Sequence, residues 1–429
     1  MPNGHINELL SATGFAKVLV TLNPGVSRAS GAAGAALAAP SVETKIQDYF
    51  VVPDQAQIMA LGASASNAAS RKVKKERSLE THPVRVYPHL GLALGYVNRK
   101  GAEGLRKDNR VAHIAAAPEL SLIRPARSRS ARLLAKPTWG IVRLQIPALW
   151  SAGIRGKGVV VGHLDTGVDG RHPALAKAIS KFAEFDLAGD EVPGAKPHDS
   201  GEHGTHTAGT IAGRPGAKGA AFGVAPEATR ASAMVIEGGQ VIDRVLAGME
   251  WIVARNIRIL SMSLGLRGFT PAFQTVVNAL RNANVLPIFA AGNEGPNSSR
   301  SPGNYDNVLS IGAFDASDNV ADFSSSQAFQ RPTDPLVPDL VAPGVDILSC
   351  IPNGKFAKMD GTSMATPHMA GFAALLLSAK PSASASELEA AILASCVRLA
   401  SMPSVRANRG APSVVTALEK LTGRALAKA

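Results

Sequence analysis

From residue 137 onward, the chain alternates short, almost continuous apolar runs with longer stretches in which apolar residues recur every three or four positions. Continuous runs are typical of strands buried on both faces of a parallel sheet, and the longer stretches are typical of helices that cover it. We expect strands at residues 158–164, 231–236, 257–262, 285–291 and 308–313, and helices at residues 205–212, 240–255, 270–284, 364–379 and 386–395. This order predicts an α/β domain with a mostly parallel sheet and helices on both faces.

The first part of the chain has shorter apolar runs and a mixed order of elements. We expect strands at residues 15–22 and 111–116, a pair of strands within 85–97, and a helix at 102–109. This order predicts a small α+β domain over residues 15–118, preceded by an unstructured lead at residues 1–14. Residues 119–136 are rich in Arg, Ser and Ala, so we expect an exposed basic linker that is open to proteolysis.

Composition narrows the functional classes. The chain has 429 residues, of which 45% are hydrophobic, and its formal net charge is +12. Much of the excess charge lies in residues 71–77 and 124–136, but aromatic residues make up only 5% of the chain and neither run contains one. Because a nucleic-acid-binding face needs aromatic side chains among its cations, we expect no nucleic-acid partner.

Targeting and redox signals are sparse. Cys350 and Cys396 are too few for a disulfide framework, and whether they pair stays open. The N-terminus, MPNGHINELL, has no cationic segment of the kind that opens a secretory signal, and no apolar run is long enough for a membrane span. We therefore expect no membrane partner and a protein that is cytoplasmic or exported by a non-classical route.

The strongest chemical signal is the stretch GTSMATPH, which precedes a run that is apolar on nearly every side. We expect a buried helix here, with Pro367 in its first turn and Ser363 at its entrance. A hydroxyl at that position can attack a carbonyl while nearby backbone N–H groups hold the developing negative charge. By itself, however, a serine before an apolar helix is more often only an N-cap than a nucleophile.

Three upstream residues change that balance. Asp165 ends an expected buried strand, His203 opens an expected helix, and Asn293 follows another buried strand in AAGNEG. In parallel sheets, chemistry gathers at the carboxyl ends of strands. A carboxylate there can orient an imidazole, the imidazole can act as a base, and an amide can donate to an oxyanion.

Two further features bear on this site. The backbone of Ser263, Leu264 and Gly265 follows another expected strand and could pair with an extended peptide. His206 lies three residues after His203, but this spacing does not match the zinc-binding HExxH motif. We therefore expect no metal, and a structural role for His206.

The blocks DTGVD, HGTHTAGTIAG, SMSLG, AAGNEG and GTSMATPHMAG, in this order, resemble the signature blocks of the subtilisin-like (subtilase) serine peptidases. The resemblance covers about residues 137–400 and implies a peptidase domain over residues 137–429. It implies that Asp165, His203 and Ser363 form a catalytic triad and that Asn293 completes an oxyanion hole. It also implies a serine endopeptidase that cleaves polypeptide substrates through an acyl-enzyme.

Residues 15–118 are similar, less strongly, to the inhibitory propeptide domain of the same family. This similarity implies a self-processing zymogen, in which the N-terminal domain acts as an intramolecular inhibitor. We expect the segment near residues 118–130 to lie in the cleft like a bound product, and cleavage in the basic linker to release activity.

The sequence departs from the family at two informative places. Many members bind calcium through an acid that follows the catalytic Asp, but Ala174 stands at that position, and residues 214–222 carry cations instead of Asn or Asp. We therefore expect no calcium at this site and no other cofactor. Arg300 lies in a short segment that helps to line the substrate pocket in the family. If it points inward, acidic substrate residues are favoured; if outward, it is a surface charge.

Two other functions compete with this hypothesis. An α/β-hydrolase esterase would need a G-x-S-x-G motif with both partners after the serine, but Gly361–Ala365 lacks the second glycine and both partners precede Ser363. A peptide-binding module without catalysis would be expected to have lost a triad residue. A casein-turnover assay separates this module from a peptidase.

Overall fold

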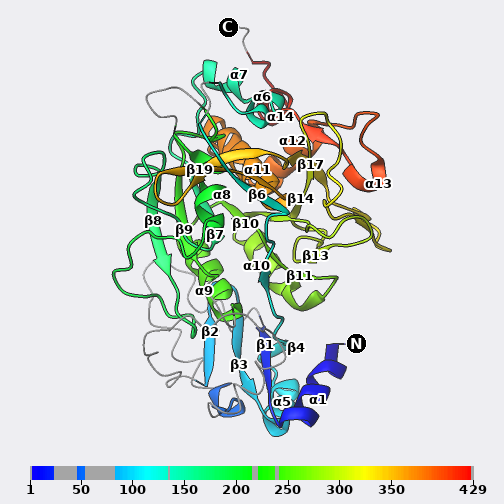
Figure 1. The fold of residues 1–429 in the computed structure, drawn as a ribbon. Coiled ribbons are helices and arrows are strands. Elements are labelled where there is room, and N and C mark those ends of the chain that lie inside the picture. The colour runs from blue at the N-terminus through cyan, green and yellow to red at the C-terminus, as the bar shows by residue number, and fades with distance from the viewer. Residues whose placement is uncertain are drawn as a thin grey trace. The chain divides into compact units, whose positions relative to one another are not determined.

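The computed structural model describes residues 2–23, 46–53, 83–133, 136–214, 221–236 and 241–426. The chain divides into two compact units, Met1–Glu119 with Leu187–Gly189 and Leu120–Asp186 with Asp190–Ala429. Figure 1 shows the sheets and helices of each unit. Among the described helices, none combines the length and the apolar character that a membrane crossing requires.

The first unit is built on an antiparallel sheet in the order β2-β3-β1-β4. Its strands are β1 (Ala16–Leu22), β2 (Val84–Tyr87), β3 (Leu92–Val97) and β4 (Val111–Ala116), and its helices are α1 (Pro2–Thr13), η2 (Gln47–Tyr49) and α5 (Arg99–Lys107). The expected unstructured lead at residues 1–14 is wrong, because α1 occupies most of it. Ile6 and Leu10 lie about one turn apart and are both buried, but the polar residues around them concealed this stripe in the sequence.

The second unit contains a seven-stranded sheet in the order β17-β14-β12-β10-β7-β9-β8, and all of its strand pairs are parallel. The strands are β7 (Val160–Asp165), β8 (Ile179–Glu184), β9 (Thr229–Met234), β10 (Ile259–Met262), β12 (Leu286–Ala290), β14 (Leu309–Phe314) and β17 (Leu340–Pro343). The sheet confirms the predicted α/β class. β8 and β17 were not predicted, because β8 carries polar residues at the sheet edge and β17 is short and ends in proline.

Helices cover both faces of this sheet. His163 and Gly162 are neighbours on β7, so they point to opposite faces. His163 contacts Thr207 of α8 (His203–Ala212), whereas a methyl group on Gly162 would lie 2.8 Å from Ile252 Cδ1 of α9 (Ile242–Val253). The long helix α11 (Thr362–Ala379) packs on α8 and on β10, β12, β14 and β17 (Figure 1). The helix that carries Ser363 therefore packs directly on the helix that begins at His203.

The second unit contains further helices and strands outside the seven-stranded sheet. The helices are α6 (Trp139–Arg143), α7 (Ile146–Ser151), η3 (Pro271–Phe273), α10 (Gln274–Asn282), α12 (Ala385–Ala394), α13 (Ser404–Ala407) and α14 (Val414–Thr422). The strands are β5 (Ser121–Leu122), β6 (Arg127–Ala131), β11 (Leu264–Arg267), β13 (Arg300–Ser301), β15 (Gln327–Ala328), β16 (Leu336–Val337), β18 (Ile347–Ile351), β19 (Lys355–Asp360), β20 (Cys396–Val397) and β21 (Ala411–Pro412).

The segment expected to be a wholly exposed linker is instead partly built into the second unit. β5 pairs antiparallel with β11, and β6 pairs antiparallel with β19. Leu120 and Ile123 are buried. Composition did not reveal these strands, because so short a stretch between basic residues has no periodicity of its own and its pairing partners lie far along the chain. Only the family resemblance placed residues 118–130 against the second unit.

Candidate active site

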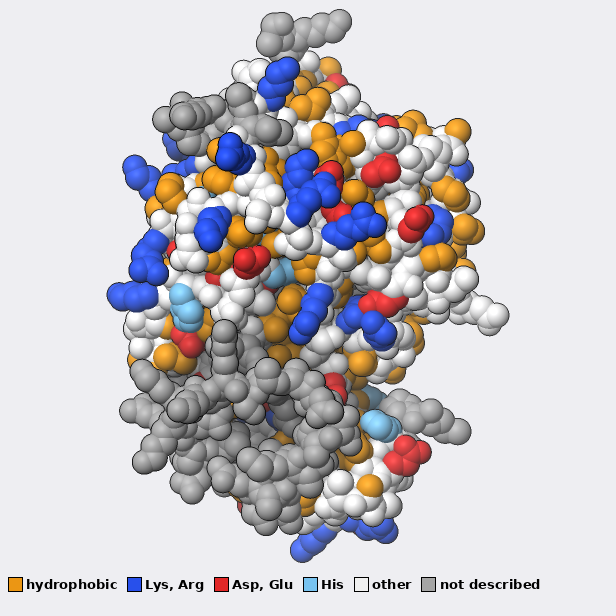
Figure 2. All heavy atoms as spheres, in the orientation of Figure 1, with side chains coloured by type: hydrophobic (Ala, Val, Ile, Leu, Met, Phe, Trp, Pro, Cys, Tyr) orange, Lys and Arg blue, Asp and Glu red, His pale blue; other side chains and the backbone are white. Residues whose placement is uncertain are grey.

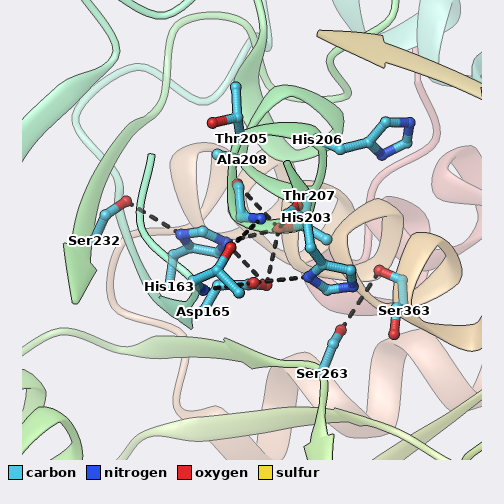
Figure 3. Close-up of polar contacts among 12 residues, drawn as sticks. His163, Asp165, His203, Thr205, His206, Thr207, Ala208, Ser232, Ser263 and Ser363 are labelled. Carbon is cyan, nitrogen blue, oxygen red and sulfur yellow. Dashed lines mark hydrogen bonds and ion pairs between the residues drawn. The ribbon is translucent and has the colours of Figure 1, made fainter. Parts of the chain in front are cut away.

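Asp165 and His203 are brought together by the end of β7 and the start of α8. Asp165 Oδ1 accepts a hydrogen bond from His203 Nδ1 at 2.7 Å and another from the Thr166 backbone N–H at 2.7 Å. Both side chains are almost completely buried. Figure 3 shows the His203 ring between Asp165 on one side and Ser363 on the other. The imidazole is thus oriented with Nδ1–H toward the carboxylate.

The surroundings of Asp165 keep its carboxylate ionised. Burial alone would raise the pKa of Asp165, but the charge and hydrogen bonds of His203 and His163 hold that pKa well below its usual range. Thr207 Oγ1 lies 3.1 Å from Asp165 Oδ2 and can donate to it. The acid at this site therefore stays negatively charged beside the imidazole.

His206 lies on the same helix but points elsewhere (Figure 3). Its Nε2 is within hydrogen-bonding distance of the backbone carbonyl oxygens of Ile347 (2.9 Å) and Ala357 (3.2 Å). Complete burial lowers the pKa of His206 to about 3, so the ring is neutral. Among the described residues, no group of three or more His, Cys, Asp or Glu could hold a metal ion. The position of His206 is that of a core residue bonding β18 and β19.

Ser363 lies in the first turn of α11 and is fully buried. Pro367 was expected in the first turn as well, but it lies inside the helix. A proline has no N–H to donate to the carbonyl four residues earlier, which here belongs to Ser363. Ser263 Oγ lies 3.5 Å from that carbonyl oxygen. The Ser363 carbonyl oxygen therefore receives no hydrogen bond from residue 367 and can accept one from Ser263.

The Ser363 hydroxyl is engaged by a backbone carbonyl. Its Oγ donates to the carbonyl oxygen of Ile123 at 2.7 Å. In the described part of the chain, no hydrogen-bond partner reaches His203 Nε2, although this atom is buried. The side of the imidazole that faces Ser363 is thus unoccupied by any competing donor or acceptor.

Asn293 presents its amide donor to the cleft. Its Oδ1 accepts from the backbone N–H and the hydroxyl of Thr362, both at 2.9 Å. Because these bonds use the oxygen, Nδ2 is directed away from Thr362 and donates to the carbonyl oxygen of Arg124 at 2.9 Å. An amide held in this way is suited to bind an oxyanion.

The linker passes through the cleft as an extended chain. Leu122 pairs with Leu264 and Ser121 with Gly265, and the Ile123 N–H donates to the Ser263 carbonyl at 3.0 Å. After a short gap, β6 runs along β19, which leads directly into α11. Residues 120–131 are therefore hydrogen-bonded to the second unit on both sides of Ser363.

Arg300 points inward rather than to solvent. Its Nη2 lies 2.5 Å from Glu294 Oε1, and its Nη1 donates to the Gly265 carbonyl at 3.0 Å and to Ser121 Oγ at 3.1 Å. Burial would raise the pKa of Glu294, but the Arg300 guanidinium lowers it, so both groups are charged. Because Glu294 already neutralises Arg300, the inward orientation does not by itself create a preference for acidic substrate residues.

The candidate site residues were predicted from the sequence, but the residues that hydrogen-bond to them were not. Glu294 appeared in AAGNEG without a role, although its charge is opposite to that of Arg300 six residues later. His163 and Thr207 were also unassigned. The signal for His163 was its position two residues before Asp165, which places both on one face of a strand.

Ala174 stands where the family resemblance places an acidic calcium ligand. Ala174 supplies no carboxylate, and its backbone carbonyl already accepts from the Arg214 N–H at 2.9 Å. Calcium needs several oxygen ligands, and a guanidinium on the adjoining residue opposes a cation. Residues 215–220 of the neighbouring loop lie outside the described residues.

Comparisons with known proteins agree with this geometry. The family model of the subtilase family matches residues 156–416. Subtilisin E of Bacillus subtilis is 33% identical over 327 residues, which cover 74% of this chain and 78% of the relative. Subtilisin BL of Lederbergia lenta is 38% identical over 247 residues, covering 57% of this chain and 85% of the relative. An intracellular serine protease of Paenibacillus polymyxa is 38% identical over 247 residues, covering 55% and 72%. The chain therefore belongs to the subtilase family and is a serine-type endopeptidase.

Proposed function

We propose that Asp165, His203 and Ser363 are the acid, general base and nucleophile of this endopeptidase. Asp165 holds the Nδ1–H tautomer of His203, and His203 Nε2 takes the Ser363 proton as Oγ attacks the substrate carbonyl. His203 then returns the proton to the leaving amine, and water hydrolyses the acyl-enzyme. The buried 2.7 Å contact between Asp165 and His203 supports this assignment.

Asn293 Nδ2 and the Ser363 backbone N–H are proposed to hold the oxyanion of the tetrahedral intermediate. The locked Asn293 amide supports this role, because donors that are fixed before reaction need not reorganise as charge develops. The backbone of Ser263, Leu264 and Gly265 binds the substrate as an added strand, with Arg300 beside the third residue before the cleaved bond.

The chain is also proposed to be a zymogen whose own linker blocks the cleft. The observation that carries this proposal is the 2.7 Å bond from Ser363 Oγ to the Ile123 carbonyl. Asn293 donates to the next carbonyl, that of Arg124. Ser363 and Asn293 thus donate to the carbonyl oxygens of two successive residues. The peptide bond between Ile123 and Arg124 must therefore move before it can be cut. The linker behaves as a slow intramolecular substrate.

Self-processing can be tested with Ser363→Ala. Wild-type protein is expected to shorten with time and to yield a new N-terminus at Arg124, whereas Ser363→Ala stays full length. The matched control is Ser404→Ala, at an exposed position of α13, which is expected to process like wild type. Appearance of the mature size in purified Ser363→Ala would show that another protease makes the cut.

Polypeptides are the proposed substrates, and the linker provides a template for them. A chromogenic anilide carrying Ser-Leu-Ile copies residues 121–123 and is expected to be hydrolysed after its last residue. On the face of the molecule seen in Figure 2, Lys and Arg side chains are dispersed among Asp and Glu, which is compatible with a neutral substrate of this kind. We further propose that no calcium binds near Ala174, so a chelator leaves the anilide turnover unchanged.

A further inference from the structure

A second histidine, His163, lies beneath the proposed acid. It is on β7, two residues before Asp165, and its side chain is only 2% exposed. Its Nε2 lies 2.8 Å from Thr207 Oγ1 and 3.6 Å from Asp165 Oδ2, and its Nδ1 lies 3.2 Å from Ser232 Oγ on β9. Figure 3 shows these side chains in a continuous array beside His203.

The spacing of strand and helix explains why two pairs form side by side. Residues two apart on β7 are separated by about 6.6 Å, and residues four apart on α8 by about 6.0 Å. Asp165 therefore meets His203 while His163 meets Thr207, four residues further along the helix. The two contacts therefore lie side by side between β7 and α8.

The hydrogen bonds around His163 favour the tautomer in which Nε2 carries the proton. If Nδ1 carried the proton, Nε2 would take the single Thr207 hydroxyl proton and would turn a lone pair toward Asp165 Oδ2. If Nε2 carries the proton, it donates to Thr207 Oγ1. The Thr207 hydroxyl proton then has three acceptors at 3.1 Å, namely Asp165 Oδ2 and the carbonyl oxygens of His203 and Gly204. The ionised carboxylate is the strongest of these acceptors. Ser232 Oγ then donates to Nδ1. The second arrangement satisfies the buried carboxylate.

We propose that His163 is a positioning residue, which acts through Thr207 to fix the carboxylate of Asp165 and hence the orientation of His203. This inference rests on the proposed role of Asp165. Oδ1 carries the bonds to His203 and to the Thr166 backbone, so the array of Ser232, His163 and Thr207 holds the other oxygen. A carboxylate held at both oxygens cannot rotate away from His203.

A purely structural role for His163 makes a different prediction. If the imidazole only fills space, Leu and Gln should replace it equally well with respect to catalysis. If it is a donor, Gln should serve better, because its amide nitrogen can reach about the position of Nε2 and donate to Thr207. The ratio of turnover between His163→Gln and His163→Leu therefore isolates the hydrogen bond from packing.

The experiment measures kcat and KM of both variants on the Ser-Leu-Ile anilide. Full-length chains are first cut by a trace of wild-type enzyme, whose own turnover is subtracted. We expect kcat of His163→Leu to fall at least tenfold with KM within twofold, and His163→Gln to stay within about threefold of wild type. A matched control for lost stability is Leu309→Ala on β14, which is expected to keep its kcat. Equal kcat values for the Leu and Gln variants would overturn the proposal.

Thr207 provides a second route if the His163 variants do not fold. Thr207→Ser keeps the bridging hydroxyl and is expected to retain turnover, whereas Thr207→Val removes it at equal volume and is expected to lose about tenfold. Equal turnover of these two variants would also overturn the proposal. Failure of the triad assignment is distinguishable, because it would appear as activity in Ser363→Ala.

Discussion

The two sides of the active site differ in how close they are to a catalytic arrangement. On the acid–base side, Asp165 and His203 are buried and already hydrogen-bonded at 2.7 Å. On the nucleophile side, Ser363 and Asn293 bond to the carbonyls of Ile123 and Arg124 instead. Contacts between β7 and α8 hold Asp165 and His203 together. The arrangement of Ser363 and Asn293 depends instead on which polypeptide segment lies beside them. Under the proposed zymogen mechanism, activation would need a change in the linker and none in the pair Asp165 and His203.

The largest expected effect comes from the side that is already assembled. Asp165→Asn keeps the shape of the side chain but removes its charge and replaces one acceptor oxygen by an N–H donor, so the side chain no longer enforces the Nδ1–H tautomer of His203. We expect kcat on the Ser-Leu-Ile anilide to fall about 10⁴-fold, the magnitude known for serine proteases of this kind, subtilisin included. Near-normal turnover would show that His203 is oriented by other groups.

The oxyanion donor should matter less. Asn293→Ala removes one of the two proposed donors, and we expect kcat to fall about 10²–10³-fold with little change in KM, the range established with subtilisin itself. The control is Asn297→Ala, at a nearby position outside the proposed site, which is expected to keep wild-type kcat. A rise in KM at constant kcat would indicate that Asn293 binds substrate in the ground state only.

The linker itself can be loosened with Ile123→Asp. Ile123 is fully buried, and burial of a side chain of this size contributes about 1.5–3 kcal/mol, so a charged replacement should raise access to Ser363 about 10–100-fold. The rate of fluorophosphonate labelling in the uncut chain measures this access. Val405→Asp, at an exposed position, is the control and is expected to label at the wild-type rate. An unchanged rate in Ile123→Asp would contradict a blocking linker.

The smallest effect concerns stability and involves His368 on α11, the helix that carries Ser363. Burial lowers the pKa of His368 to about 4, below the value of about 6.5 in an unfolded chain. Between these values the unfolded state binds the extra proton, so the imidazole makes unfolding easier as pH falls, by at most about 1.4 kcal/mol per pH unit. Denaturant unfolding of Ser363→Ala from pH 7 to 4 should show this slope, and His368→Gln should reduce it.

A second buried group also changes the free energy of unfolding with pH, and its contribution must be separated from that of His368. The buried carboxyl of Asp339, whose pKa burial raises to about 8, contributes the opposite slope between its unfolded value and pH 8. The difference between His368→Gln and its parent cancels this contribution. Ser404→Ala, at an exposed position without a titratable side chain, is the control and should leave the slope unchanged. Identical slopes for the parent and His368→Gln would show that His368 does not titrate this way.

The α/β class and the positions of Asp165, His203, Ser363 and Asn293 at element ends could be predicted, because local periodicity and short motifs carry that information. Other features could not. The β8 strand is at a sheet edge and half polar, so it lacks a continuous apolar run. The α1 helix conceals its two buried residues among polar ones. The inward turn of Arg300 depends on Glu294, which no spacing rule connects to it.

Local order along the chain was enough to define the frame and the chemistry of this peptidase. Strand and helix periodicities recur within a few residues, and reactive side chains follow each element directly. The family resemblance also led us to expect residues 118–130 in the cleft. The hydrogen bonds of that segment and the role of the second histidine beside Asp165 emerge only in the folded molecule. The hydrogen bond from Ser363 Oγ to the Ile123 carbonyl joins residues that are 240 positions apart in the sequence. Local residue patterns cannot predict such a contact, because it depends on how distant segments pack.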